Sequence, residues 1–444
     1  MSGHNLIQDY QQKHLLELLR HLWRNSPFYR EYYESYGIHE KDLPELTIED
    51  LPFLTKKILM ENFDAAVIDR QIRKKDVERW IHERRDPRQI SYRDFIVFNS
   101  SGSSGDVGIF LYDKISWQVM NAMIAKRLPQ PENYPSGKTR VACYNAWGIG
   151  MPGSVTSALQ LPEAVYEVLM VSLLDPPERV ASQLNAFQPH RIIGYSSSVT
   201  AMAELAILGQ LEIRPKRIFA TGDRLNSPMR KKIETAWDAP VDLLYCSSES
   251  VYLAIQECGQ EEWKVLDKLN IVEILDDDDQ AVQPGGYGRV VLTNLYNYAL
   301  PILRYELGDY AIRGAGRSEG GSTTIRDIRG RVGEALPVIG RDGKQDSIHP
   351  IVLAEFYAVG LETVQFVSLR PDYVRLDYMA ETDIDDAVRM AFRHLLDKKG
   401  ALETRIEVRR VDHIPKDLRT GKLRLVRTES EHEPQASSPL RENG

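Results

Sequence analysis

The sequence predicts an α/β protein with a large N-terminal domain and a small α+β C-terminal domain. From residue 95 onward, short apolar runs alternate with helical segments, which is typical of a largely parallel sheet flanked by helices. Near residue 270 the pattern turns to hairpins, so antiparallel strands extend the sheet and make it mixed. The chain has 444 residues, and this length favours two domains.

The N-terminal region is expected to be helical. Residues 9–36 carry leucines at helical spacing followed by an aromatic cluster, which indicates a helix docked on the body of the protein. A charged stretch at 73–86 is expected to form another helix, and its basic residues are read as a solvated face rather than a polyanion site.

The sheet is expected to be built from residues 95–295. The apolar runs predict strands at 95–98, 140–146, 164–170, 191–195, 217–222 and 241–247. Helices are expected at 198–209 and 227–237, and antiparallel strands at 270–275 and 286–295. The four aspartates Asp276 to Asp279 lack the ligand spacing of a calcium loop, so we expect a solvated hairpin tip there.

The C-terminal part is expected to form a smaller unit. Strands are predicted at 364–370, 373–380 and 404–411, and an amphipathic helix at 383–399. We therefore divide the chain into an N-terminal domain (1–332), a small C-terminal domain (333–428) and a polar tail expected to be disordered (429–444).

Composition and charge narrow the classes of function. Acidic residues outnumber basic ones, 64 to 56, which argues against a nucleic-acid-binding or membrane-surface protein. The N-terminus is too charged for a signal peptide, and the three cysteines show no disulfide framework. We expect a soluble cytoplasmic protein with no nucleic-acid or membrane partner, and a homodimer stays open.

A serine- and glycine-rich segment follows directly on the predicted strand 95–98. Such a loop can wrap phosphate oxygens with backbone N–H groups and hydroxyls, although similar runs also occur as plain flexible loops. It is not a Walker A loop, because no Gly-Lys-Ser/Thr follows. Its candidate phosphate-binding residues are Ser100, Ser101, Gly102, Ser103, Ser104 and Gly105.

Three further segments carry side chains suited to nucleotide chemistry. In LLYCSSES, Tyr245 ends a strand and Glu249 follows four residues later. In LPILRYELGDY, Asp309 comes just after a strand, at a glycine turn, and Lys422 follows a glycine near the end of the ordered chain. Each also has a structural interpretation: a packed tyrosine, a turn aspartate or a surface lysine.

Taken in this order, the segments resemble the acyl-adenylate-forming superfamily, in the branch similar to phenylacetate–CoA ligase. The resemblance extends from the NSPFYREYYESYGI segment to Lys422. It implies ATP-dependent activation of a carboxylic acid, Mg²⁺ as cofactor, and the serine- and glycine-rich loop as the binding site of the triphosphate. It also implies a small C-terminal domain that swings about a hinge between two poses.

The resemblance also implies a role for each matching residue. Tyr245 would stack on adenine, Ser248 would contact the α-phosphate, and Glu249 would bind magnesium. Asp309 would hold the ribose hydroxyls, and Lys422 would reach the reacting carboxylate. Arg331 would contact the nucleotide beside the hinge, and two residues would line the adenine site: Gly222 and Asp223.

The sequence departs from the pattern of this family at four places. Asp106 stands where relatives often have lysine, Cys246 replaces a glycine, and the hinge reads Gly333-Glu334. The loop that lines the CoA channel in relatives is replaced by VIGRDGKQDSIHP (338–350). The thiol of a carrier-protein phosphopantetheine, or an amine, therefore remains an alternative to CoA as the acyl acceptor. A stretch that holds a zinc-binding cysteine cluster in some relatives has no cysteine here, so we expect no structural zinc.

The segments NAWGIGMPG and GYSSSV match the acid pocket of the family, and the expected acid is hydrophobic and aromatic. Trp147 and Tyr195 would form an apolar wall, and the serines after Tyr195 would read a ring hydroxyl, although Trp147 is equally well explained as a core residue. The remaining candidate pocket residues are Gly148, Ser196 and Ser197. A non-catalytic nucleotide-binding relative is the competing class, and retention of Glu249 together with the other motif residues argues against it.

Overall fold

The structure is a computed structural model. It describes residues 3–84, 86, 89–99, 108–125, 137–145, 163–172, 175, 177–222, 224–315, 323–331, 336–340, 345–348, 353, 356, 358–399, 401, 403–415 and 424–429. The chain divides into two compact units, of which the first holds residues 1–328 and the second begins at residue 329. No described helix has both the length and the apolar character needed to cross a membrane.

The first unit begins with two helices where one was predicted. α1 (Gly3–Asn25) ends before Ser26, and α2 (Pro27–Ser35) starts immediately after it. The Ser26 side chain accepts a hydrogen bond from the backbone N–H of Tyr29, and Pro27 occupies the first turn of α2. The helical character expected over 9–36 is confirmed, but the helix is interrupted at Ser26, because a serine cap followed by proline starts a new helix.

Short elements then lead to the first sheet. They are η1 (Glu40–Asp42), η2 (Ile48–Asp50), α3 (Lys56–Glu61), α4 (Phe63–Ala66) and α5 (Lys74–Glu83). The small sheet is antiparallel and has the order β1 (Ser91–Tyr92), β2 (Phe95–Asn99), β3 (Ile109–Tyr112), with α6 (Lys114–Ala125) following. Asn99 pairs with Ile109, so β2 and β3 are joined at the ends that flank the serine- and glycine-rich segment.

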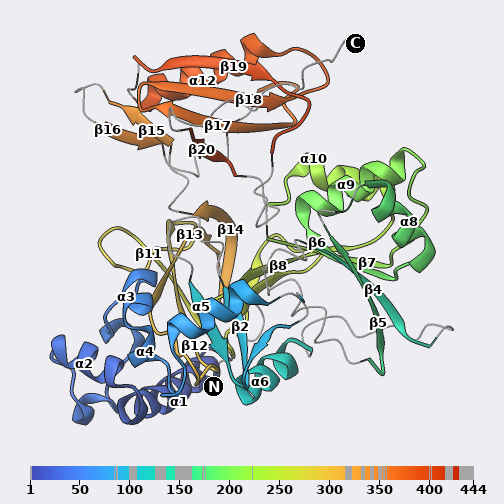
Figure 1. The fold of residues 1–444 in the computed structure, drawn as a ribbon. Helices are drawn as coiled ribbons and strands as arrows, with labels where there is room; N and C mark the ends of the chain where they lie inside the picture. Colours follow the sequence, from blue (N-terminus) through green and yellow to red (C-terminus); the bar gives the residue numbers. More distant parts are fainter. Residues whose placement is uncertain are drawn as a thin grey trace, which may run out of the picture. The chain divides into compact units, whose positions relative to one another are not determined.

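The centre of the first unit is an eleven-stranded mixed sheet (Figure 1). Its strand order is β11-β12-β13-β14-β10-β9-β8-β7-β6-β4-β5. Neighbouring strands are parallel from β8 to β5, whereas β8 and β9 are antiparallel. This mixed α/β architecture confirms the predicted fold class.

The parallel half consists of strands that are buried except at the edge strand β5, together with the helices between them. Its strands are β4 (Thr139–Asn145), β5 (Tyr166–Ser172), β6 (Arg191–Tyr195), β7 (Arg217–Thr221) and β8 (Val241–Ser247). Its helices are α8 (Pro177–Phe187), α9 (Ser196–Ile207) and α10 (Ser227–Ala236), drawn beside the green strands in Figure 1. Parallel strands need helical crossovers, so their runs are apolar on both faces.

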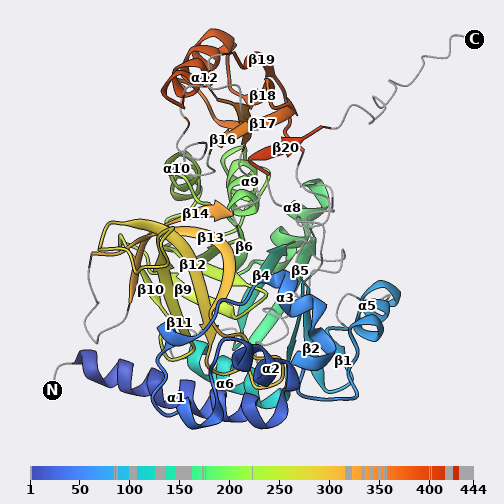
Figure 2. The same ribbon diagram turned by 90° about the vertical axis from the view of Figure 1, so that its left-hand side faces the viewer.

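The antiparallel half is covered by the N-terminal helices. Its strands are β9 (Val251–Gln256), β10 (Trp263–Val265), β11 (Asn270–Leu275), β12 (Tyr287–Asn294), β13 (Tyr305–Arg313) and β14 (Thr324–Arg331). Gln11 of α1 donates to the carbonyls of Asp267 and Asn270, both at 3.1 Å, so α1 is fixed near the start of β11 (Figure 2). Leu15, Leu18, Leu19 and Leu22 of α1 lie in the same buried cluster as the strands.

The second unit is a smaller α+β structure. Its hairpin is β15 (Leu336–Ile339) with β16 (Gln345–Ile348). Its sheet has the order β19-β18-β17-β20, formed by β17 (Thr363–Arg370), β18 (Tyr373–Met379), β19 (Arg405–Arg410) and β20 (Val426–Thr428). α12 (Asp385–Lys399) buries Val388, Phe392 and Leu396 in the core it shares with this sheet.

Candidate active site

The carboxyl ends of the parallel strands bring several predicted site segments to one edge of the sheet. Tyr195 at the end of β6 pairs with Thr221 of β7, and Thr221 pairs with Leu244 of β8. The residues that follow these strands therefore meet at this edge, where open α/β sheets bind their ligands. They include Gly222 after β7 and the turn Ser248–Ser250 after β8, which we call the carboxylate turn.

Two of the predicted site residues, Tyr245 and Asp309, are in direct contact in the structure. The Tyr245 hydroxyl donates a hydrogen bond of 2.7 Å to Oδ2 of Asp309, and both residues are only 8% exposed. The ring of Trp263 meets the Tyr245 ring edge to face, with centroids 6.4 Å apart. The ring expected to stack on adenine and the carboxylate expected to bind ribose are therefore held together.

A bulge in β13 explains the position of Asp309. Arg289 of β12 pairs with Tyr310 and Val291 pairs with Glu306, so one residue of β12 faces three residues of β13. Gly308 lies in this bulge and has a φ of 80°, in the left-handed region that favours glycine. Asp309 was predicted just after a strand, and that position was wrong, because the strand continues through the bulge to Arg313.

The carboxylate turn lies at the antiparallel junction between β8 and β9. Glu249 is 5% exposed, and the carbonyl of Ser248 accepts a hydrogen bond of 2.9 Å from the hydroxyl of Tyr112 in β3. Glu249 is therefore shielded from solvent beside the carboxyl ends of the parallel strands, unlike an ordinary surface charge, and its role stays a prediction.

The adenine-site segment after β7 is described only in part. Gly222 has φ of 78°, which suits glycine, and the preceding Thr221 donates its hydroxyl to the carbonyl of Leu244 at 2.9 Å. This contact ties the end of β7 to β8, one residue before Tyr245. Asp223 lies outside the described residues.

The acid-pocket segment after β6 is buried. Tyr195 is the residue before α9 and Ser196 begins that helix, and both are buried, whereas Ser197 is half-buried. Trp147 and Gly148 lie outside the described residues, so the aromatic wall remains a prediction.

The remaining predicted residues are beyond what the structure describes. They are Ser100, Ser101, Gly102, Ser103, Ser104, Gly105, Asp106, Gly333, Glu334 and Lys422. Arg331 is the last residue of β14, with its side chain outside the described part. Their roles stay predictions.

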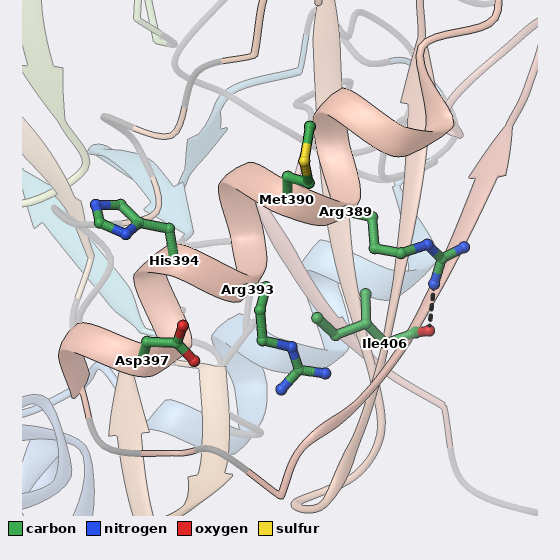
Figure 3. A pocket seen from close by; sticks show the side chains of 6 residues that line it. All are labelled: Arg389, Met390, Arg393, His394, Asp397 and Ile406. Atoms are coloured by element: carbon green, nitrogen blue, oxygen red, sulfur yellow. Dashed lines mark hydrogen bonds between the residues drawn. The ribbon is translucent and has the colours of Figure 1, made fainter.

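A hollow of about 340 Å³ lies elsewhere, on the second unit between α12 and β19 (Figure 3). The Arg389 guanidinium donates to the carbonyl of Ile406 at 2.8 Å, and Arg393 donates to the carbonyl of Thr404 at 3.0 Å. Through these bonds both arginines connect α12 to the chain at and just before β19. None of the predicted site residues lines the hollow.

The chain has distant relatives among known proteins. The chain matches no protein-family model. It is 21% identical over 311 residues to Protein CapK of Staphylococcus aureus, covering 69% of this chain and 63% of CapK, less than two thirds of that relative. It is 23% identical over 382 residues to phenylacetate-coenzyme A ligase of Escherichia coli K12, covering 83% of this chain and 78% of the relative.

Solved structures share the fold at low sequence identity. A 2-hydroxyisobutyryl-CoA ligase in the postadenylation state, in complex with 2-HIB-AMP, superposes with a TM-score of 0.69 at 18% identity, covering 95% of this chain and 89% of that one. An O-succinylbenzoate coenzyme A synthetase of Bacillus subtilis, in complex with ATP and magnesium ion, has a TM-score of 0.52 at 12% identity, covering 74% and 68%.

The chain therefore shares the fold of these acyl-adenylate-forming enzymes. Its relatives include the phenylacetate-coenzyme A ligases of Escherichia coli and Thermus thermophilus, each 23% identical, so the sequence is similar to that branch.

Proposed function

We propose that this protein uses ATP to convert a carboxylic acid into an acyl-adenylate and then transfers the acyl group to the thiol of CoA. The observation that carries the proposal is the contact between Tyr245 and Asp309, beside the carboxylate turn that holds Glu249. An aromatic ring fixed to a carboxylate suits a nucleoside, since the ring can stack on a base while the carboxylate accepts hydrogen bonds from ribose hydroxyls.

In the first half-reaction, a carboxylate oxygen of the acid attacks the α-phosphorus of ATP and the bond to the β-phosphate breaks, so pyrophosphate leaves. In the second, the thiolate sulfur attacks the acyl carbon and the bond to AMP breaks. We assign the triphosphate to Ser100–Gly105, the α-phosphate contact to Ser248, and the cation beside the reacting carboxylate to Lys422. Arg331 is assigned to the nucleotide beside the hinge.

The residues fit a magnesium ion bound largely through the substrate. Mg²⁺ takes hard oxygen ligands and is commonly held by one or two carboxylates together with phosphates. Within the described part of the chain no group of three or more candidate metal ligands occurs, and Glu249 offers a single shielded carboxylate. Bound magnesium would supply charge stabilisation at the phosphates.

We propose CoA as the acyl acceptor because phenylacetate-coenzyme A ligases of two bacteria match most of the chain. Because segment 338–350 differs from the loop that lines the CoA channel in relatives, the thiol of a carrier-protein phosphopantetheine remains the alternative acceptor. The acid is proposed to be hydrophobic and aromatic, from the same branch.

Pyrophosphate exchange with a panel of acids tests the proposal. We expect exchange with aromatic acids such as phenylacetate and benzoate. Exchange with long fatty acids or amino acids alone would reject the aromatic assignment, and no exchange with any acid would reject adenylation. Mass spectrometry after addition of CoA, a holo carrier protein or amines then identifies the acceptor.

A further inference from the structure

Three consecutive carbonyls of the carboxylate turn each accept a hydrogen bond from a buried side chain. The carbonyl of Ser248 accepts from the Tyr112 hydroxyl at 2.9 Å, and that of Glu249 accepts from Nδ2 of Asn294 at 3.2 Å. The carbonyl of Ser250 accepts from the Tyr296 hydroxyl at 2.9 Å. We call Tyr112, Asn294 and Tyr296 the turn clamp.

The turn clamp is itself held rigidly. All three side chains are buried, and the rings of Tyr112 and Tyr296 stack with centroids 6.2 Å apart and planes at 21°. Oδ1 of Asn294 accepts from the backbone N–H groups of Tyr296 and Asn297 at 3.0 and 2.9 Å, which fixes the orientation of its amide. Burial raises the pKa of both tyrosines above the usual range, so both phenols stay neutral and able to donate.

The members of the turn clamp come from two separate parts of the chain. Tyr112 ends β3, the strand that follows the serine- and glycine-rich segment. Asn294 ends β12, and Tyr296 lies just after it. The clamp therefore connects the hairpin of the expected phosphate loop with the turn that carries Glu249. The charge of Glu249 contributes to raising the pKa of Tyr112, after burial and Tyr296, which indicates that carboxylate and phenol are near each other.

We propose that the turn clamp consists of positioning residues that set Glu249 for magnesium-bound ATP. This inference rests on the proposed function. The clamp contacts the backbone of the turn on both sides of the Glu249 side chain, so it fixes the point from which that side chain extends. A functional group must be held within about 0.5 Å of its productive position, and a tight turn achieves this only with such support.

The competing explanation is that the three bonds only satisfy buried carbonyls, which would lose free energy without a partner. The two explanations differ in what a lost hydroxyl affects. A purely structural bond affects stability alone, whereas a positioning bond also affects the magnesium dependence.

The test uses Tyr112→Phe and Tyr296→Phe, each of which removes one hydroxyl and keeps the ring. Tyr29→Phe is the matched control, because the buried Tyr29 hydroxyl donates to a backbone carbonyl, that of Pro301, away from the turn. For each clamp variant we expect the Mg²⁺ concentration for half-maximal pyrophosphate exchange to rise about 2- to 10-fold, the range for one hydrogen bond. The control should lose stability with an unchanged Mg²⁺ requirement.

Two readouts do not depend on turnover. Calorimetry should show that Mg²⁺ strengthens ATP binding less in the clamp variants than in wild type or Tyr29→Phe. Hydrogen exchange should be faster at the amides of the carboxylate turn in the clamp variants only.

The possible failures are distinguishable. Equal Mg²⁺ dependence in all four proteins, with loss of stability alone, would overturn the positioning role while leaving adenylation intact. If the wild-type protein shows no pyrophosphate exchange with any acid tested, the proposed function is contradicted instead. In that case the calorimetric comparison still decides whether the clamp acts on magnesium-bound ATP. If Mg²⁺ does not strengthen ATP binding in wild type either, the positioning role is wrong as well.

Discussion

The phenol of Tyr245 donates its hydrogen bond to the carboxylate of Asp309 across 2.7 Å, although the two residues are 64 positions apart in the chain. One lies on the last parallel strand, β8, and the other on an antiparallel strand, β13. In the proposed function, recognition of the base and of the ribose is therefore linked through a single bond.

Removing that bond should weaken ATP binding. Tyr245→Phe keeps the ring for stacking but leaves Asp309 without the donor that orients it. Hydrogen bonds to charged groups contribute about 1.5–3 kcal/mol, so we expect the KM for ATP in pyrophosphate exchange to rise about 10-fold or more. Tyr29→Phe again serves as the control. If the KM for ATP of Tyr245→Phe equals that of wild type within experimental error, the bond between Tyr245 and Asp309 does not contribute to nucleotide binding.

Neutralising Glu249 should affect catalysis far more than folding. Glu249→Gln keeps the shape of the side chain and removes the charge proposed to bind magnesium. We expect exchange to fall by about 10²–10³-fold, the size typical of a lost electrostatic contact in a transition state, with thermal unfolding nearly unchanged. Exchange close to that of wild type would show that the motif assignment is wrong.

Lys422 should serve the first half-reaction alone. A cation beside the carboxylate and α-phosphate assists formation of the adenylate, and in the alternating-pose proposal it is carried away before thiol attack. Lys422→Ala should lose most exchange yet still transfer the acyl group from supplied acyl-AMP. Gly333→Pro should do the reverse, because proline fixes φ and restricts the swing at the hinge. Timing each step in both variants checks this, and equal loss of both steps in Lys422→Ala would reject the proposal.

A buried carboxylate in β11 should make stability depend on pH. Oε1 of Glu273 lies 3.4 Å from Nη2 of Arg304, whose guanidinium lies over the ring of Phe53 at 4.2 Å. Burial raises the pKa of Glu273 from 4.5 to about 7, even though the charge of Arg304 opposes the shift. Between these two values the folded protein binds more protons than the unfolded chain, so the free energy of unfolding decreases as pH rises.

Urea unfolding at pH 5 and pH 8 measures this effect. The contribution of Glu273 should decrease by about 2–3 kcal/mol between the two pH values. Glu273→Gln cannot titrate and should lack that part of the slope. Parallel pH profiles of the two proteins would contradict the raised pKa.

Much of the fold could be predicted because its signals are local. The apolar runs that predicted β6, β7 and β8 match those strands within one residue, since buried parallel strands are continuous apolar segments. The break between α1 and α2 was also readable, as Ser26 followed by Pro27 is a helix-start signal, but the leucine periodicity around it was given more weight.

The features that could not be predicted depend on distant pairing. The bulge that positions Asp309 depends on the register between β12 and β13, which no local pattern reveals. The short strand β10 (Trp263–Val265) is too brief for a periodicity signal. Tyr112 contacts Ser248 across 136 positions, and a buried tyrosine in an apolar strand is indistinguishable in sequence from ordinary core.

The anchoring of the N-terminal helices to the antiparallel half has a consequence for biosynthesis. The bond from Tyr29 to the carbonyl of Pro301 spans 272 positions, and four leucines of α1, Leu15, Leu18, Leu19 and Leu22, are buried in the same cluster. At about 5–20 residues per second, a ribosome needs about 14–54 s to make the intervening chain. Until the last of the antiparallel strands is made, the apolar face of α1 is only partly covered, so a nascent chain halted before Pro301 would be an aggregation-prone fragment rather than a smaller folded protein.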